Sequence, residues 1–224
     1  MFPYGLGNVT AGLWKFSTQD GVFDNYAFGA AVVADLASGL AAASATGWND
    51  SRGAVYVWRY RDDAGDAHKV NMPGWEGPRL SWAEEGIAGR PGGRFGATLA
   101  ASAGFGVLAV GAPGAEATFP DGSGTGRRIT ASGVGRVLLY QRRLGADGSP
   151  VRPTAFDLRA TLPSDDDIAA QFRWNQQPGI GSSLTLAPSG RMLAFGGAQR
   201  CGMGGKGGVF LSPPSFNNPC SPLL

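Results

Sequence analysis

The chain has 224 residues, 43% hydrophobic and 16% charged, which is enough to bury one sizeable core or two small ones. Its 37 glycines and 15 prolines, mixed with many apolar residues, are typical of short strands joined by tight turns. The formal net charge of +2 comes from scattered basic residues, and no apolar run reaches about 18 residues, so the sequence predicts no nucleic-acid surface and no membrane-spanning helix.

The first residues, MFPYGLGNVTAGLW, lack the basic start and continuous apolar stretch of a secretory signal. Either the protein is not exported, or this chain is missing its natural beginning. Asn8 begins an Asn-Val-Thr triplet that matches the N-glycosylation acceptor pattern, which mildly supports export.

Three segments of the chain resemble one another: FGAAVVADLASGLAAASA from Phe28, FGATLAASAGFGVLAVGAP from Phe95 and IGSSLTLAPSGRMLAFGGA from Ile180. Each begins with Phe or Ile, then Gly and a small residue, and continues through a short apolar stretch and a turn. Each then reaches a Leu-Ala pair 12 or 13 residues after its start, at Leu40, Leu108 and Leu193. Self-similarity of this kind predicts a repeat architecture.

A second landmark recurs later in each unit, as GAVYVW from Gly53, GRVLLY from Gly135 and GGVFLS from Gly207. A glycine followed by alternating β-branched, aromatic and aliphatic residues predicts a strand with two apolar faces. One face carries Tyr56, Leu138 and Phe210, and the other carries Val55, Val137 and Val209. A strand that is apolar on both faces needs cover on both sides, as neighbouring propeller blades provide.

A fourth, weaker strand precedes each unit, in GLWKFS, PRLSWAEE and FDLRATL. Four short strands per unit are the pattern of a propeller blade. The longest loop, residues 113–133, is rich in turn-forming residues and is expected on the surface.

These residues resemble the FG-GAP repeat, the β-propeller blade of integrin α-chain heads and of many surface proteins. FG occurs at Phe28 and Phe95, VGAP begins at Val110, and FGGA begins at Phe195. The resemblance implies an all-β fold: a β-propeller-type repeat of about three four-stranded antiparallel blades. We expect one domain over residues 1–224, with repeats at approximately 14–82, 83–160 and 161–212 and a C-terminal tail at 213–224.

The number of units falls short of a closed ring, because known propellers close with about four to eight blades and those of the family that this chain resembles usually have seven. The sequence therefore predicts a partial or open propeller. Three explanations stay open: a fragment of a larger chain, which we favour, an open segment, or an association that covers the exposed blade faces.

Family blades often carry an Asp-rich calcium loop between their first two strands, but the corresponding turns here contain only one carboxylate, Asp35. We therefore expect no calcium and no other cofactor. CGMGGKGG, from Cys201, lacks the hydroxyl residue of a phosphate-binding loop. Cys201 and Cys220 could form one disulfide or remain free thiols.

Catalytic candidates are few, and the sequence predicts no catalytic or metal site and no enzyme. The single histidine, His68, lies in a charged segment, where a surface position is the simpler interpretation. Two acidic clusters are better explained as solvated turns than as acid–base or cation sites: Asp62, Asp63 and Asp66, and Asp165, Asp166 and Asp167.

The function expected is a non-catalytic interaction module of a cell-surface or secreted protein, binding a protein or glycan through blade loops. The alternatives are a propeller-bearing enzyme or accessory domain of a glycan- or lipid-acting hydrolase or lyase, and a fragment without independent function. The residues predicted to contact a ligand are Trp48, Asn49, Asp50, Arg52, Trp75, Phe119, Asp121, Arg127 and Arg128.

Overall fold

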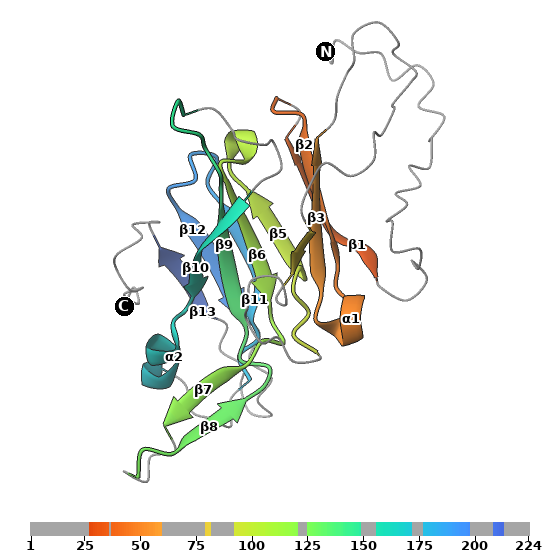
Figure 1. Ribbon diagram of the computed structural model, residues 1–224. Helices are drawn as coiled ribbons and strands as arrows, with labels where there is room; N and C mark the ends of the chain where they lie inside the picture. Colours follow the sequence, from red (N-terminus) through yellow and green to blue (C-terminus); the bar gives the residue numbers. More distant parts are fainter. Residues whose placement is uncertain are drawn as a thin grey trace, which may run out of the picture.

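The computed structural model is an all-β fold in which three antiparallel sheets stand side by side (Figure 1). It describes residues 27–35, 37–59, 79–81, 92–120, 125–148, 156–171, 177–197 and 208–212. Each sheet is one blade of a partial, open propeller. The first strands of the blades lie next to one another, as the strands nearest the axis of a propeller do.

The first blade has the strand order β1-β2-β3-β4. Its strands are β1 (Phe28–Asp35), β2 (Leu40–Ala45), β3 (Ala54–Arg59) and β4 (Arg79–Ser81), and a short helical turn, α1 (Trp48–Ser51), joins β2 to β3. The strands follow one another as an antiparallel meander, because each connection returns the chain to the neighbouring position in the sheet.

The second blade has the order β5-β6-β9-β10, with a hairpin inserted between its middle strands. Its elements are β5 (Thr98–Ala101), the 3-10 turn η1 (Ala103–Phe105), β6 (Val107–Ala112), β9 (Arg136–Arg142) and β10 (Phe156–Leu162). The inserted hairpin consists of β7 (Ala117–Pro120) and β8 (Arg128–Ala131), and the helix α2 (Asp165–Gln171) packs against β7. Part of the segment expected as a surface loop is therefore regular structure.

In the third blade, the described strands are β11 (Ile180–Leu186), β12 (Leu193–Gly197) and β13 (Gly208–Ser212), in that order. The weak strands that precede the second and third units in the chain pair with the unit before them: β4 with β3, and β10 with β9. The first of the weak strands, GLWKFS, lies outside the described residues.

The strand register corrects one alignment made from the sequence. Ala34 pairs with Ala41, as Ala101 pairs with Leu108 and Leu186 with Leu193. The residue equivalent to Leu108 and Leu193 is therefore Ala41 and not Leu40, and it lies 13 residues after the start in all three units. The first hairpin adds one more pair, Asp35 with Leu40, and this places the leucine on the opposite face.

Two apolar clusters fill the spaces between neighbouring blades. The first includes Val55 and Val57 from β3 and Leu138 and Tyr140 from β9, and the second joins β6 and β9 to β11 and β12. Because Tyr56 and Val137, which face the other way, are also buried, the prediction of two apolar strand faces is confirmed for the first two units. Burying a large apolar side chain contributes about 1.5–3 kcal/mol, so packing between blades is a main source of stability.

A pair of backbone hydrogen bonds, which we call the blade joint, connects consecutive blades in the same way twice. Phe95 N–H donates to the carbonyl of Arg52 over 2.9 Å, and Ile180 N–H donates to the carbonyl of Val134 over 2.8 Å. The preceding residue in each case makes a second bond: Arg94 to the carbonyl of Ser51, and Gly179 to the carbonyl of Gly133.

At this joint, the residue directly before the third strand of each of the first two blades has to be glycine. A Cβ atom on Gly53 would lie 2.1 Å from the carbonyl oxygen of Phe95, and one on Gly135 would lie 2.1 Å from that of Ile180. Both glycines also have φ of +88°, a conformation that side chains disfavour. The repeat of glycines seen in the sequence is therefore explained by close approach of backbone to backbone.

Candidate functional site

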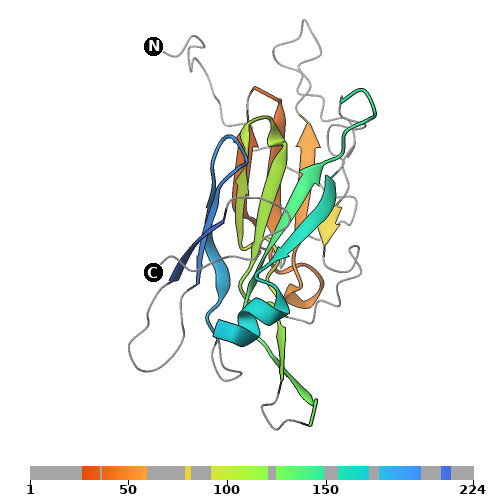
Figure 2. The same ribbon diagram turned by 90° about the vertical axis from the view of Figure 1, so that its left-hand side faces the viewer.

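The connections at one end of the blades gather most of the described residues that were predicted to contact a ligand. This end, which we call the loop end, comprises α1, the β7–β8 hairpin and α2; Figures 1 and 2 show all three at the same end of the sheets. In both of the first two blades, the connection between the second and third strands in the sheet lies here. The fold thus brings together segments that are far apart in the sequence.

The α1 turn has an unusual left-handed backbone. Asn49, Asp50 and Ser51 have φ of 50°, 56° and 61°, three consecutive non-glycine residues with positive φ. Asn and Asp tolerate this conformation better than other side chains, which is the one sequence signal that could have revealed it. Of the predicted contact residues in this turn, Asp50 is exposed, whereas Trp48, Asn49 and Arg52 are half-buried.

The left-handed turn has a structural role in the blade joint. It directs three consecutive carbonyls, those of Asp50, Ser51 and Arg52, toward the second blade, where each accepts a backbone N–H at 2.8 to 3.1 Å. The strain at this turn is therefore explained by the connection between blades and does not by itself indicate a binding site.

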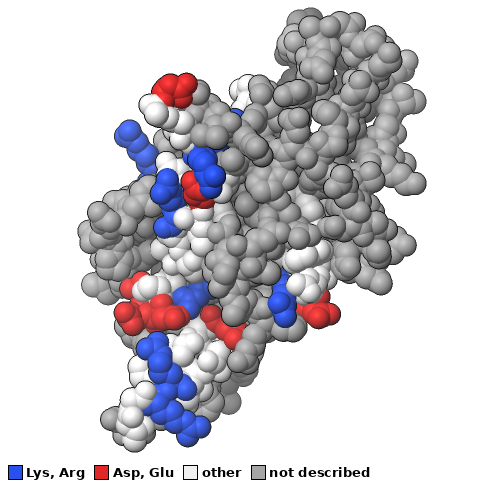
Figure 3. Space-filling model, in the orientation of Figure 1, with Lys and Arg blue, Asp and Glu red and all other residues white. Residues whose placement is uncertain are grey.

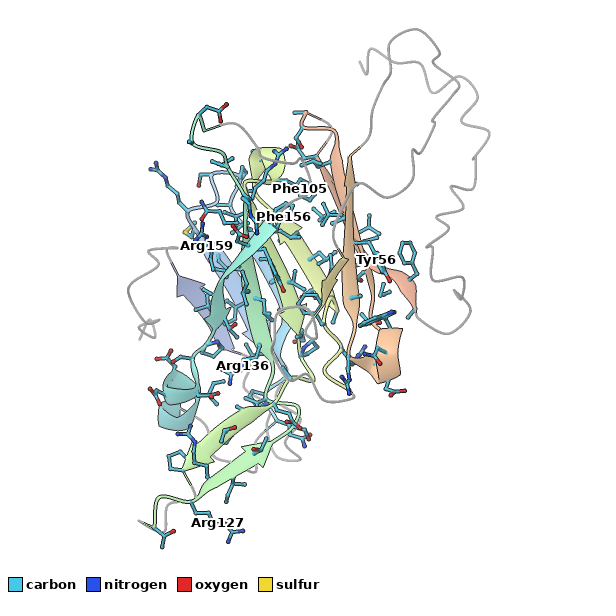
Figure 4. All side chains as sticks on the ribbon, in the orientation of Figure 1. Tyr56, Phe105, Arg127, Arg136, Phe156 and Arg159 are labelled. Carbon is cyan, nitrogen blue, oxygen red and sulfur yellow. The ribbon has the colours of Figure 1, made fainter. Side chains whose placement is uncertain are left out.

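The β7–β8 hairpin has a buried base and an exposed tip. Phe119 is only 3% exposed and packs with Ala117, Val134 and Ile168. The expectation of a surface side chain at Phe119 is wrong, because the hairpin needs an apolar residue to attach it to α2. Arg127 and Arg128 are exposed toward the tip, and Arg127 extends away from the blades in Figure 4.

The acidic residues of α2 are used in local contacts. Asp167 accepts from the hydroxyl of Ser164 over 2.6 Å, and Asp167 N–H donates back to that hydroxyl over 3.1 Å, which caps the start of the helix. Asp165 forms an ion pair with Arg136, which is 6% exposed and also donates to the carbonyl of Pro163 (Figure 4). Asp166 is exposed.

Charges of both signs lie near one another at the loop end. Figure 3 shows the arginines of the hairpin below the acidic residues of α2. The tip of the β7–β8 hairpin is therefore positively charged, and the surface of α2 beside the start of the hairpin is negatively charged. Exposed charges of this kind influence the choice and encounter of a partner more than affinity itself.

At the opposite end, charged groups hold turns in place. Asp35 accepts from Gly104 N–H of the second blade over 2.8 Å, and the hydroxyl of Ser38 together with the N–H groups of Gly104 and Ala37 lowers the pKa of Asp35. The hydrogen-bonded guanidinium of Arg143 similarly lowers the pKa of Asp157. Among the described residues, no three His, Cys, Asp or Glu side chains are grouped to hold a metal ion.

Several predicted residues lie outside the described part of the chain, so the structure places none of them. They are Asn8, Asp62, Asp63, Asp66, His68, Trp75, Asp121, Cys201 and Cys220.

No protein-family model and no curated protein matches the chain. In the part of the chain that the structure describes, no helix is both long and apolar enough to cross a membrane.

Proposed function

We propose that the chain is an FG-GAP-like propeller module of a cell-surface or secreted protein, which binds a protein or glycan through its loop end and has no catalytic role. The FG and VGAP residues support the assignment to the family, and the three blades agree with it. The observation that carries the binding role is the β7–β8 hairpin, which is inserted into the second blade and projects beyond the sheets.

The hairpin is built to present its tip on a fixed base. An isolated two-stranded hairpin is at best marginally stable in water, whereas here Phe119 and Ala117 are buried against Ile168 of α2. Arg128 also donates to the carbonyl of Thr118 on the facing strand, over 3.2 Å. A surface that is ordered before binding loses less conformational entropy when a ligand is bound.

The chemistry of the tip favours an anionic ligand. Arg127 and Arg128 are both exposed, and a guanidinium can bind a carboxylate or sulfate group through two parallel hydrogen bonds. An acidic protein surface, or a glycan with carboxylate or sulfate groups, provides such partners.

The test is binding of the fluorescently labelled chain to an array of neutral, sialylated and sulfated glycans and to immobilised extracellular-matrix proteins. We expect the double variant Arg127→Ser, Arg128→Ser to lose the signal on the anionic ligands. The matched control is Arg143→Ser, because this arginine is 55% exposed but lies at the opposite end. Equal binding by both variants would refute the assignment of the ligand site to the hairpin.

A further inference from the structure

The face of the first blade that points away from the second blade carries an unusually exposed apolar residue. Val32 pairs with Ala43 just as Leu99 pairs with Val110 and Leu184 pairs with Phe195, so Val32, Leu99 and Leu184 are equivalent. Leu99 and Leu184 pack into the clusters toward the preceding blade. Val32 is instead 62% exposed, so it occupies a packing position without the corresponding burial.

The start of β1 also has the backbone conformation with which the second and third blades bond to the blade before them. The residue before the first Phe or Ile has φ of 49°, 53° and 59° in the three blades, at Ala27, Arg94 and Gly179. The following glycine has φ of 81°, 88° and 86°, at Gly29, Gly96 and Gly181. In the second and third blades, this conformation forms the blade joint. The first blade thus begins with the same receiving geometry.

The outward face of the third blade is equivalent to the faces with which the first and second blades pack on the blade that follows them. Thr185 is equivalent to Val33 and Ala100, because these residues pair with Ala194, Ala42 and Ala109 at one register position. Val33 and Ala100 pack toward the following blade, whereas Thr185 is exposed.

A hydroxyl group on this outward face matches a specific contact made between the second and third blades. Thr98 donates from its hydroxyl to the carbonyl of Gly181 over 2.7 Å. Ser183 is equivalent to Thr98 by register and is exposed, and Gly29 of the first blade is equivalent to Gly181. Donor and acceptor are therefore present at the two ends of the row of blades.

We propose that the third blade of one chain docks on the first blade of a second copy, with the geometry of the internal blade joint. Ser183 then donates to the carbonyl of Gly29 in the other copy, and Val32 is buried beneath the β11–β12–β13 sheet. The contact joins two different surfaces, and a contact of that kind forms a ring when the rotation closes. Two copies with three blades each give six blades, within the range of about four to eight known for closed propellers.

The test is sedimentation equilibrium of the full chain and three single variants. We expect the wild type to have twice the chain mass of 23.1 kDa. Val32→Asp and Thr185→Arg should each weaken the dimer by at least about 100-fold, because each places an unpaired charge in an apolar contact. Leu144→Asp is the matched control, since Leu144 is 52% exposed and lies between β9 and β10 of the second blade, which takes no part in the proposed contact; it should leave the dimer intact.

Mixing the two interface variants separates this arrangement from other dimers. A mixture of Val32→Asp and Thr185→Arg chains retains one unaltered contact, so it should regain dimers that neither variant forms alone. Circular dichroism of each variant checks that the blades remain folded, as expected for substitutions at exposed positions. A monomeric wild type would overturn the proposal, and so would a dimer that is insensitive to either interface substitution or a mixture that stays monomeric.

Discussion

Replacing Gly135 with alanine tests the blade joint directly. The new Cβ would lie 2.1 Å from the carbonyl oxygen and 2.2 Å from the nitrogen of Ile180, which are backbone atoms that cannot rotate away. Overpacking of this kind costs about 1–3 kcal/mol, and the φ of +88° adds about 1–2 kcal/mol for a residue with a side chain. We therefore expect Gly135→Ala to lower the free energy of unfolding by about 3 kcal/mol.

The assay is thermal and urea unfolding followed by circular dichroism at one fixed protein concentration. A loss of about 3 kcal/mol in a chain of this size lowers the melting temperature by about 6–12 °C. Gly148→Ala is the matched control, because Gly148 also has positive φ, +77°, but has no neighbouring atom within 4 Å of the added Cβ. Gly148→Ala should lower the free energy of unfolding only by the cost of placing a side chain at positive φ, about 1–2 kcal/mol.

The difference between the two variants isolates the contact between blades. If Gly135→Ala and Gly148→Ala unfold at the same temperature, backbone approach at the joint contributes nothing beyond the glycine conformation. The explanation given above for the repeated glycines would then be wrong.

Three further substitutions, one of them with a matched control, probe the loop end and the turns. Phe119→Ala should destabilise the chain by about 3 kcal/mol in urea unfolding, because it empties a buried cluster; a change below about 1 kcal/mol would argue against the buried base. Asp165→Asn should cost about 1–2 kcal/mol by leaving the buried guanidinium of Arg136 without its carboxylate. Asp157→Asn should leave the unfolding transition unchanged, because the arginine that it pairs with, Arg143, is 55% exposed. Because the pKa of Asp35 is lowered in the folded state, this carboxylate stabilises the fold at pH values above its ordinary pKa of 3.8, and the stabilisation is lost as the pH falls through the lower folded-state pKa. The free energy of unfolding of Asp35→Asn should therefore depend less on pH in acid unfolding. An unaltered pH dependence would contradict this contact.

Much of the fold could be predicted from local patterns. Alternating apolar residues in GAVYVW and GRVLLY require burial on both faces, and both segments are strands that are buried on both faces. β9 lies between the two inter-blade clusters, and β3 lies between the first of them and a small cluster of Ala45, Ala54 and Tyr56. Small residues and glycines around the first two strands of each unit predicted turns and close backbone approach, and the repeat of these features indicated blades.

The candidate site was less predictable, because side-chain exposure depends on distant segments. Nothing near Phe119 in the sequence shows that α2, which begins at Asp165, will cover it. The exposed arginines at 127 and 128 were predicted correctly as surface residues, since a charged pair beside glycines has no local reason to be buried.

The sequence by itself determined the described strands of the blades and the three repeated units, because alternation and turn residues act over a few neighbouring positions. It did not predict the β7–β8 hairpin, which lies in a segment expected as a loop. Only the tertiary structure decided that Ala41 takes the position expected for Leu40, that β10 belongs to the second blade, and that Asn49 to Ser51 turn left-handed. Register, sheet membership and that strained turn all depend on hydrogen bonds between segments far apart in the chain, and local preferences cannot specify those bonds.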